Sequence, residues 1–294
     1  MQLNPYCMCC LINKQEKIIR NFEDEEKKVN YMKGILRRLA EADPEESSPS
    51  IYQEFQEYFS TFWNVPQEDY TDIKKEYNSL MMELEGRLRK VICASPDPLA
   101  SALQHARIGN YIDFAALSQV DKSQVLSMIE EKNKSPLDPV EYSQFLSEMA
   151  SAKNLVYLTD NCGEIVLDKI ALSIIKEHYP DLNITAVVRG EPVVNDATLE
   201  DAVMCGLTEI VPVMGNGSGV CGTWLKDVNE ETLTLLNNAD VIISKGQGNF
   251  ETLNGCGLNI YYLFLCKCDW FVRMFQAEPL QGMFVNERRV NVHR

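Results

Sequence analysis

Histidine and positive charge are both scarce in this sequence. Only three histidines, His105, His178 and His293, occur among 294 residues. They are too few and too scattered to indicate a histidine-rich metal site or a Ser/His/Asp triad. Lysines and arginines number 28 against 43 aspartates and glutamates, which gives a net charge of -15 and no basic stripe. We therefore expect no nucleic-acid partner and no anionic membrane partner.

Long apolar runs are also absent. No stretch approaches the roughly 20 apolar residues that a membrane span needs, and no uninterrupted apolar run follows the first five residues. These features predict a soluble, unexported, cytoplasmic protein. Its ten cysteines are then expected to be reduced thiols, mostly small core residues. No heptad seam or long exposed apolar strand indicates an interface, so the oligomeric state stays open.

The two halves of the chain differ in periodicity. Residues 1–150 place apolar residues three and four apart among Glu and Lys, which is typical of amphipathic helices. From residue 151 on, short β-branched runs alternate with amphipathic helices, which is the pattern of βαβ units around a parallel sheet. The sequence thus predicts an α/β fold, with a helical domain at 1–150 and an α/β domain at 151–294.

The pattern predicts individual elements as well. The predicted helices span residues 11–42, 51–63, 69–92, 98–109, 121–132, 139–150, 166–178, 197–205, 230–237 and 270–275. The predicted strands span residues 155–158, 184–188, 209–213, 241–244 and 260–266.

Acidic and amide side chains follow the first two predicted strands. Asp160 and Asn161 come directly after the first strand, and Asp196 follows the second. Because the carboxyl ends of parallel strands meet at one edge of the sheet, we expect the three side chains to lie together. Carboxylate and amide oxygens suit Mg²⁺ or Mn²⁺. The alternative is that these residues only cap the helices that follow, which is the commoner role for Asp-Asn at such a turn.

Two lysines follow the fourth and fifth predicted strands. Lys245 opens the segment Lys245-Gly246-Gln247-Gly248-Asn249, whose glycines would let backbone and lysine approach an anion closely. The ordinary interpretation of this segment is a flexible turn with a solvated lysine. Lys267 interrupts a run of apolar residues, where a buried lysine would need an anionic partner.

Glycine and cysteine motifs carry weaker signals. Residues 217–222 match the spacing G-x-G-x-x-G, but they follow the third strand instead of opening the fold, so we do not expect NAD binding. Cys7 and Cys10 form a C-x-x-C pair, and Cys266 and Cys268 form a C-x-C pair. The two pairs could hold zinc if they met, whereas buried thiols without chemistry is the leading interpretation for most of the cysteines. The role of Cys7 and Cys10 stays open.

Six short motifs follow one another along nearly the whole chain. They are Pro5-Tyr6-Cys7-Met8-Cys9-Cys10, Asp97-Pro98-Leu99 continuing to Gly109-Asn110-Tyr111-Ile112-Asp113, Thr159-Asp160-Asn161-Cys162-Gly163-Glu164, Asn195-Asp196, Lys245-Gly246-Gln247-Gly248-Asn249-Phe250-Glu251, and Lys267-Cys268. In this order they resemble the metal-dependent damage-control phosphatases, a family first catalogued as domain of unknown function 89. The C-x-x-C pair is similar to that of a subgroup found largely in prokaryotes.

The resemblance implies both a fold and a site. The fold is a three-layer α/β/α, Rossmann-like, mostly parallel sheet with an N-terminal all-helical domain. A divalent metal ion (Mn²⁺, Mg²⁺, Co²⁺ or Ni²⁺) would be held by Asp160, Asn161 and Asp196. The phosphate of a small phosphorylated metabolite would be surrounded by residues from both domains, namely Asn110, Asp113, Lys245, Asn249 and Lys267.

The implied activity is metal-dependent hydrolysis of phosphomonoesters of small metabolites such as sugar phosphates, including damaged or overflow metabolites. Asp160 and Asp196 are the candidate catalytic residues, because either could orient a water or accept its proton. Direct attack by a carboxylate is also possible chemistry. Two alternatives stay open: a carboxyl methyltransferase that uses S-adenosylmethionine, and a protein that binds phosphometabolites without catalysis.

Overall fold

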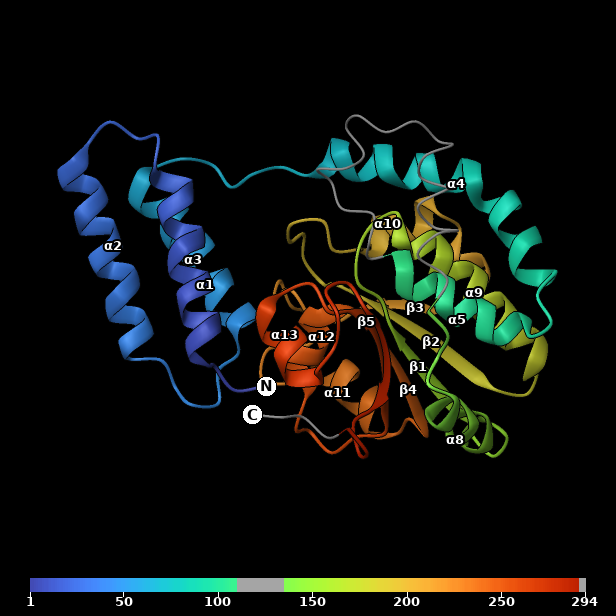
Figure 1. The fold of residues 1–294 in the computed structure, drawn as a ribbon. Helices are drawn as coiled ribbons and strands as arrows, with labels where there is room; N and C mark the ends of the chain where they lie inside the picture. Colours follow the sequence, from blue (N-terminus) through green and yellow to red (C-terminus); the bar gives the residue numbers. More distant parts are fainter. Residues whose placement is uncertain (110–134, 291–294) are drawn as a thin grey trace.

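The computed structural model describes residues 1–109 and 135–290. A six-stranded sheet lies at the centre of the larger part of the molecule (Figure 1), with the strand order β3-β2-β1-β4-β5-β6. Strands β1 to β5 run parallel to one another, and β6 pairs antiparallel with β5. The strands are β1 Asn154–Leu158, β2 Asn183–Val188, β3 Val213–Gly215, β4 Val241–Lys245, β5 Ile260–Leu265 and β6 Gly282–Asn286.

Helices precede, connect and follow these strands. Those before the sheet are α1 Pro5–Ile19, α2 Glu25–Ala40, α3 Ser48–Trp63, α4 Thr71–Cys93, α5 Pro98–Ile108 and α8 Pro139–Met149. Those within the sheet region are α9 Glu164–His178, α10 Leu199–Met204, α11 Glu230–Asn237, α12 Gly246–Leu253 and α13 Asp269–Phe275, with a short 3-10 helix, η2, at Leu207–Glu209.

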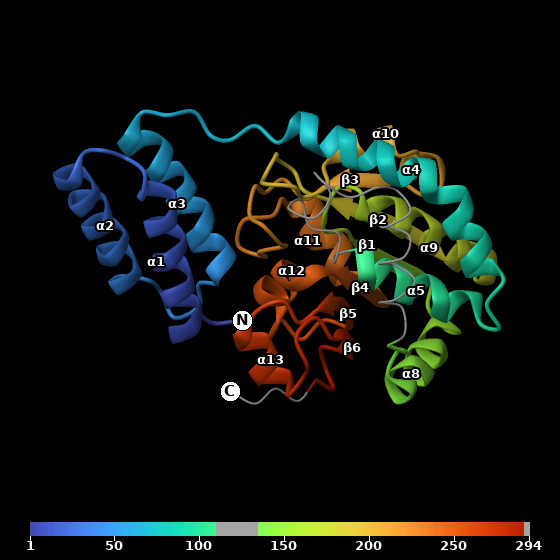
Figure 2. The same ribbon diagram turned by 45° about the horizontal axis from the view of Figure 1, so that its top comes forward.

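Successive residues of β1 face opposite sides of the sheet. Leu155 and Tyr157 belong to a hydrophobic cluster with α4, α5 and α9, whereas Val156 and Leu158 belong to a cluster with α11, α12 and α13. Helices therefore cover both faces, as parallel sheets require, and Figures 1 and 2 show these two helical layers. The predicted three-layer α/β/α, mostly parallel fold with helices at its N-terminus is confirmed.

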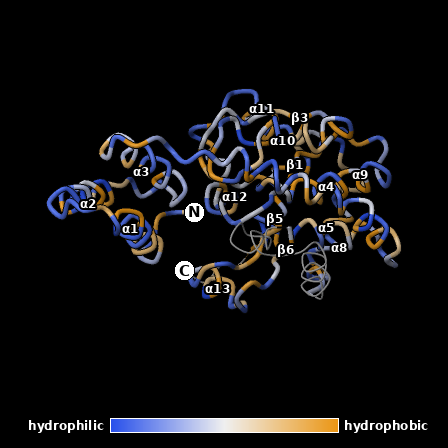
Figure 3. The backbone as a smooth tube through the Cα atoms, turned by 90° about the horizontal axis from the view of Figure 1, so that it is seen from above, coloured by the Kyte–Doolittle hydropathy of each residue, from blue (hydrophilic) through white to orange (hydrophobic). Residues whose placement is uncertain are grey.

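Helices α1, α2 and α3 have a core of their own. Tyr31 and Ile35 of α2 are buried against Leu11 of α1 and Phe55 of α3. Figure 3, a view from above, shows the three helices beside the sheet, with hydrophilic and hydrophobic residues alternating along each. Residues 64–70, which contain no helix or strand, connect them to α4.

The other helices before the sheet pack differently. Leu84 of α4, Leu103 of α5 and Phe145 of α8 share one hydrophobic cluster with Tyr157 of β1. Core packing therefore joins α4, α5 and α8 to the sheet, whereas α1, α2 and α3 form a separate cluster. The division into domains at residue 150 stays a prediction.

The bounds of two predicted elements differ most from the structure. The predicted helix 11–42 is two helices, because the carboxylate of Asp24 accepts the N–H of Lys27 at 2.9 Å and begins a new helix there. The predicted strand 209–213 is displaced, since Leu207–Glu209 is a 3-10 helix and the strand follows it. The predicted helix 121–132 lies outside the described residues.

Two elements were missed altogether. Strand β6 was not predicted from its five residues. Helix α12 begins at Gly246, which the sequence had indicated as part of a turn, and Gly246 does adopt a positive φ of 79°. The turn is therefore confined to the first residue of the helix, which sets Gln247 and Asn249 on a helical turn at the end of β4.

Candidate active site

Strand β1 lies where the strand order reverses, between β2 and β4, so the crevice beyond its carboxyl end is the expected ligand site. Asp160 and Asn161 leave β1 at this point, and Asp196 follows β2. An isolated antiparallel bridge joins Asn161 to Asp196, with the N–H of Cys162 donating to the carbonyl of Asn195 at 2.8 Å. The N–H of Ala197 donates to the carbonyl of Asp160 at 2.7 Å. The backbone thus brings the three predicted metal ligands together.

None of these three side chains caps a helix. The N-cap of α9 is Gly163, with φ 69° and no side-chain cap, and the N-cap of α10 is Thr198, which forms a capping box with Asp201. The alternative assignment of Asp160, Asn161 or Asp196 as caps is therefore wrong. The three side chains therefore lack the usual structural role for Asp or Asn at a helix start.

A further residue, Arg189, belongs to this group. Its Nε donates to Asp196 Oδ2 at 2.5 Å, and its Nη2 lies 3.6 Å from Asp160 Oδ1. The side chain is 1% exposed, and Nη2 has no hydrogen-bond partner among the described residues. Sequence reasoning did not name Arg189 as a site residue, although it directly follows β2 in the position where Thr159 follows β1.

Burial and mutual repulsion act on both carboxyl groups. Burial first, and then the charges of Asp196 and Glu164, raise the pKa of Asp160 to about 8, against the opposing charges of Arg189 and Lys267. Burial also raises the pKa of Asp196, although Arg189 opposes it. Each carboxyl group is thus held in surroundings that penalise its negative charge, and an added cation would relieve that penalty.

Lys245 lies in a buried network directly behind Asn161. Its Nζ forms ion pairs with Glu164 and with Asp168, the latter at 2.8 Å, and the hydroxyl of Tyr157 donates to Asp168 at 2.6 Å. Burial disfavours the charged lysine, but Asp168 and Glu164 outweigh burial and raise its pKa. Asn161 Nδ2 donates to Asp160 at 2.8 Å and lies 3.3 Å from Glu164. Glu164 therefore links this buried network to the amide of Asn161 and helps to orient that amide.

The other residues predicted around the phosphate have different surroundings. Asn249 is fully buried, and its Nδ2 donates to the carbonyls of Thr159 at 3.0 Å and Lys245 at 2.7 Å. It ties the ends of β1 and β4 together. Lys267 is exposed, contrary to the expectation of a buried lysine, and its ammonium forms no ion pair with any described residue. Its charge nevertheless lowers the pKa of Asp160, so it lies close to the crevice.

Asn110 and Asp113 lie outside the described residues. The described chain stops just before them at Gly109, the C-cap of α5. A Cβ added to Gly109 would lie 2.6 Å from Cγ of Glu164. The end of α5 therefore meets the same acidic network that orients Asn161.

Gly246 allows the turn after β4 to press against the carboxylates. A Cβ added at this position would lie 2.0 Å from Asp160 Oδ2, and its φ of 79° is one that L-residues rarely adopt. Any side chain here would occupy the space of the Asp160 carboxylate. The requirement for glycine is therefore local to the site and separate from any need for flexibility.

The donor set fits a hard divalent cation. Two carboxylates and one amide lie together at the ends of neighbouring strands, and burial penalises the negative charge of both carboxylates. Among residues 1–109 and 135–290, no group of three or more His, Cys, Asp and Glu side chains is arranged to hold a metal. The predicted set contains only two such side chains, because its third member is the amide of Asn161.

The glycine-rich segment after β3 forms a loop beside the site. Residues 216–229, all of them described, contain no helix, so the helix that a dinucleotide fingerprint requires is missing. Backbone approach explains the glycines, since a Cβ on Gly190 would lie 2.2 Å from the backbone nitrogen of Gly217. Burial raises the pKa of the Cys221 thiol, and the charges of Asp196, Arg189 and Asp160 also act on it. The loop thus borders the carboxylates.

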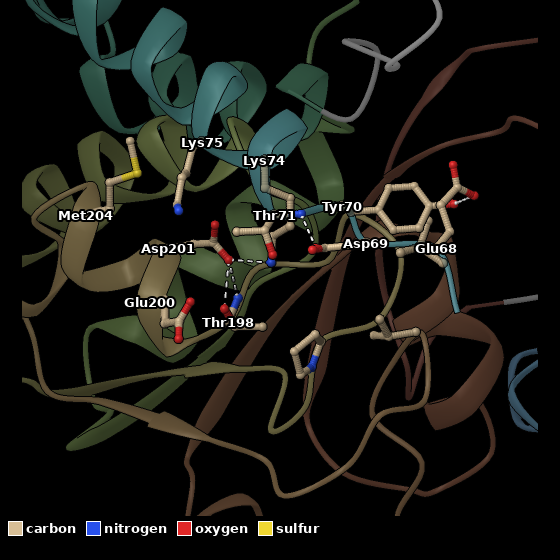
Figure 4. Close-up of a pocket in the computed structure, with 13 residues that line it drawn as sticks. Glu68, Asp69, Tyr70, Thr71, Lys74, Lys75, Thr198, Glu200, Asp201 and Met204 are labelled. Atoms are coloured by element: carbon tan, nitrogen blue, oxygen red, sulfur yellow. Dashed lines mark hydrogen bonds and ion pairs between the residues drawn. The ribbon is translucent and has the colours of Figure 1, made fainter. Parts of the chain in front are cut away.

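A pocket of about 320 Å³ adjoins the segment that leads to Asp196. Figure 4 shows it between the start of α4, with Tyr70 and Lys74, and the start of α10, with Thr198 and Asp201. Lys74 and Asp201 form a buried ion pair at 2.6 Å that joins the two helices. Residues 192–194, just before Asp196, also line this pocket, so it flanks the site without containing the predicted ligands.

A second pocket, of about 690 Å³, lies between α1, α12 and α13. Cys7, Cys10 and Cys268 line it, and the charges of Glu251, Cys268 and Cys10 add to burial in raising the pKa of Cys7 to about 12. Tyr6 stacks on Trp270 with ring centroids 5.3 Å apart, which fixes α1 against α13. The N-terminal cysteine motif thus meets Cys268, while Cys266 is buried in the sheet cluster.

Comparisons with known proteins identify the family to which the chain is similar. Residues 3–280 match the family model described as damage-control phosphatase ARMT1-like domain. The chain is 28% identical to a damage-control phosphatase of Archaeoglobus fulgidus, over 92% of this chain and 93% of that protein. It is 29% identical to damage-control phosphatase PH1575 of Pyrococcus horikoshii, over 93% of this chain and 94% of that protein. The crystal structure of a DUF89 family protein from Pyrococcus horikoshii matches with a TM-score of 0.80 and 25% identity, over 98% of this chain and 99% of that chain.

No helix in the described part of the chain is long and apolar enough to cross a membrane.

Proposed function

This chain belongs to the damage-control phosphatase family, and we propose that it hydrolyses phosphomonoesters of small metabolites with the help of a divalent metal ion. Sugar phosphates, including damaged or overflow metabolites, are the proposed substrates. The observation that carries the proposal is the grouping of Asp160, Asn161 and Asp196 at the switch point of the sheet, with no helix to cap. Two buried carboxylates without that structural role are best explained by a bound cation.

Asp160, Asn161 and Asp196 would hold the metal ion through their oxygens. The chemistry supplied by such an ion when bound is neutralisation of charge on phosphoryl oxygens and activation of water. Glu164 keeps the amide of Asn161 directed so that its oxygen is free for the ion, since Nδ2 is the atom that faces Glu164 and Asp160. Asp160 or Asp196 would orient a water or accept its proton as the water attacks phosphorus and the alcohol leaves. Alternatively, one of the two carboxylates would attack phosphorus and displace the alcohol, and water would then hydrolyse the aspartyl-phosphate.

Cationic side chains would bind the phosphate. Arg189 Nη2 is a buried donor with no partner among the described residues, next to Asp160, and it is suited to a phosphoryl oxygen. Lys267 adds an exposed ammonium from the other side of the crevice. Lys245 and Asn249 would act from the buried side of the phosphate site. Lys245 would contribute its positive charge, and Asn249 would fix the turn after β4 through its hydrogen bonds to the backbone. Asn110 and Asp113 remain proposed contacts.

The test is hydrolysis of an aryl phosphate by protein stripped with a chelator, with Mg²⁺, Mn²⁺, Co²⁺ and Ni²⁺ added back one at a time. We expect activity only with an added ion. Asp160→Asn and Asp196→Asn should each lower the metal-restored rate by roughly 1,000-fold, because each removes a ligand of the ion and the charge that it balances.

Asp181→Asn is the matched control, since it removes one carboxylate from an exposed position between α9 and β2. It should leave the rate unchanged. Full activity in Asp160→Asn or Asp196→Asn would refute the assignment of the site. Binding of a sugar phosphate by the wild type without release of phosphate, with every ion, would favour a binding protein over an enzyme.

A further inference from the structure

The pocket between α1, α12 and α13, called here the Lys14 pocket, plays no part in the proposed phosphate chemistry. It is lined by Lys14, Lys17, Gln247, Glu251, Cys268 and Trp270, among other residues. Its volume of about 690 Å³ lies in the range of pockets that hold small metabolites. All of its lining residues are described, so its walls are fully defined.

The Lys14 pocket borders the crevice at the carboxyl edge of the sheet. Gly246 packs against the Asp160 carboxylate, and Gln247, the next residue along α12, lines the pocket. Gln247 Oε1 accepts the N–H of Lys267 at 2.6 Å. After β4, Gly246 therefore borders the crevice and Gln247 lines the pocket. After β5, Lys267 borders the crevice and Cys268 lines the pocket.

Lys14 lines the pocket from α1. Its Nζ stands 4.0 Å from the centre of the Tyr52 ring on α3. Its charge acts on Glu251, which lines the pocket, and also on Cys221, whose thiol feels Asp160 and Asp196 as well. A molecule that extends from Lys14 past Gln247 would reach the crevice, because Gln247 lines the pocket, accepts the N–H of Lys267 and follows Gly246, which packs against Asp160.

The charge of the pocket is suited to an anion. Lys14 and Lys17 are exposed, and neither forms an ion pair with a described residue, although the same helical bundle pairs Arg38 with Glu46 at 2.6 Å. Burial raises the pKa of Glu251 to about 7, against the charges of the N-terminal ammonium and Lys14, so this acid is only partly ionised near neutral pH. Two unpaired cations are thus opposed mainly by Asp269 at the pocket rim.

We propose that the Lys14 pocket binds a second anionic group of the substrate, with Lys14 and Lys17 as its specificity-determining residues. This inference rests on the proposed phosphatase function. It narrows the substrate class to small phosphomonoesters that carry a carboxylate or a second phosphate a few bonds from the scissile phosphate. The scissile phosphate lies at the carboxylates, and the second anion lies toward α1.

Matched substrates test the proposal. Glycerol 3-phosphate and 3-phosphoglycerate differ only in a carboxylate that replaces a hydroxymethyl group. Fructose 1-phosphate and fructose 1,6-bisphosphate differ by a second phosphate. In the metal-loaded wild type, kcat/KM should be at least roughly tenfold higher for 3-phosphoglycerate or for fructose 1,6-bisphosphate than for its partner. This is the gain expected from one charge-assisted contact with the second anionic group. The pair that shows the preference tells which anion the pocket takes.

Variants then assign the preference to the pocket. Lys14→Ala and Lys17→Ala should each reduce the preference without altering kcat/KM for the substrate that lacks the second anionic group, and Lys14→Arg should retain it. Lys33→Ala, which removes an exposed lysine from α2 away from the pocket, is the control. A preference that survives Lys14→Ala and Lys17→Ala together would overturn the inference.

The two proposals fail in different ways. Hydrolysis of the aryl phosphate with equal kcat/KM within both substrate pairs leaves the phosphatase function intact and refutes the Lys14 pocket. Absence of hydrolysis for every phosphate refutes the proposed function. In that case calorimetric titration with the same substrate pairs tests whether the Lys14 pocket binds a second anionic group. Equal affinities within each pair would refute that binding.

Discussion

Two buried pairs of carboxylates flank Asn161, and each pair is served by one cationic side chain. Behind Asn161, Lys245 contacts both Glu164 and Asp168. At the strand ends, Arg189 bonds Asp196 at 2.5 Å but stands 3.6 Å from Asp160, with Nη2 lacking a hydrogen bond among the described residues. The two cations differ in their contacts, because Lys245 contacts both of its acids closely, whereas Arg189 hydrogen-bonds only Asp196.

Access to solvent follows the same division. Asp160 and Asp196 keep 7% and 5% of their surface exposed, whereas Asp168 and Lys245 keep none. An enclosed ion-paired network is a structural element, whereas a pair of acids that keeps access to solvent can take up a ligand. The number of acids therefore does not mark the site, whereas access to solvent and the longer contact with Arg189 do.

The sharpest way to break this comparison is to remove each cation in turn. Lys245→Met leaves Glu164 and Asp168 buried without their counter-charge and should destabilise the fold by about 3–5 kcal/mol. Arg189→Met should also destabilise the metal-free protein. Urea unfolding with and without Mn²⁺ distinguishes the two variants. A bound ion can supply the positive charge lost with Arg189, but it cannot reach the buried acids Glu164 and Asp168.

We therefore expect Mn²⁺ to restore much of the stability of Arg189→Met and none of that lost in Lys245→Met. Lys33→Met, an exposed position on α2, controls for the loss of a lysine. Equal rescue of both variants by Mn²⁺ would show that the two networks are not different in kind.

A smaller effect is expected from adding a side chain at Gly246, where it would clash with the Asp160 carboxylate. Gly246→Ala places a Cβ where Asp160 Oδ2 now lies, so the carboxylate must move and activity should fall by at least about tenfold. Gly255→Ala is a close control, since Gly255 also has a positive φ, 98°, but no atom within 4 Å of an added Cβ. Both variants pay the backbone strain of roughly 1–3 kcal/mol. Equal activities in the phosphatase assay would contradict the proposed contact.

The smallest effect concerns Glu251, a half-buried acid that belongs to neither pair. Its pKa is raised from 4.5 to about 7 by burial, against the N-terminal ammonium and Lys14. Because the folded state binds this proton more tightly than the unfolded state, the stability contribution of Glu251 falls as pH rises from 4.5 to 7. Relative to Glu251→Gln, the wild type should lose roughly 1–2 kcal/mol over this interval, after allowance for partial exposure. A constant difference between the two unfolding curves at all pH values would contradict this.

Sequence pattern predicted the parts of the site that depend on strand ends. Asp160, Asn161 and Asp196 were expected at one edge because parallel strands end together, and the structure places them there. The capping alternative could not be rejected from sequence, since it depends on φ at Gly163 and on the exact first turn of α10. Those backbone angles are set by tertiary packing, which a dipeptide does not encode.

Long-range partners were the part that sequence could not supply. Lys245 was predicted as a phosphate-binding residue, with a solvated turn lysine as the ordinary alternative, and its ion pairs were not foreseen because Glu164 and Asp168 lie about 80 positions earlier. A signal did exist: Glu164 and Asp168 are four residues apart on α9, so they share one face of a helix whose first turns are buried. The predicted helix began at residue 166, which left Glu164 outside it and hid the pair. Helix bounds are the weakest part of such predictions.

The central claim is that Asp160, Asn161 and Asp196 hold a divalent ion, and calorimetric titration of chelator-stripped protein with Mn²⁺ tests it most directly. We predict one ion per chain for the wild type. Asp196→Asn, which keeps the shape of the side chain, should weaken that binding by at least about 100-fold, whereas Asp168→Asn should leave a measurable site. Wild-type affinity for Mn²⁺ in Asp196→Asn would contradict the assignment of the metal to this edge of the sheet.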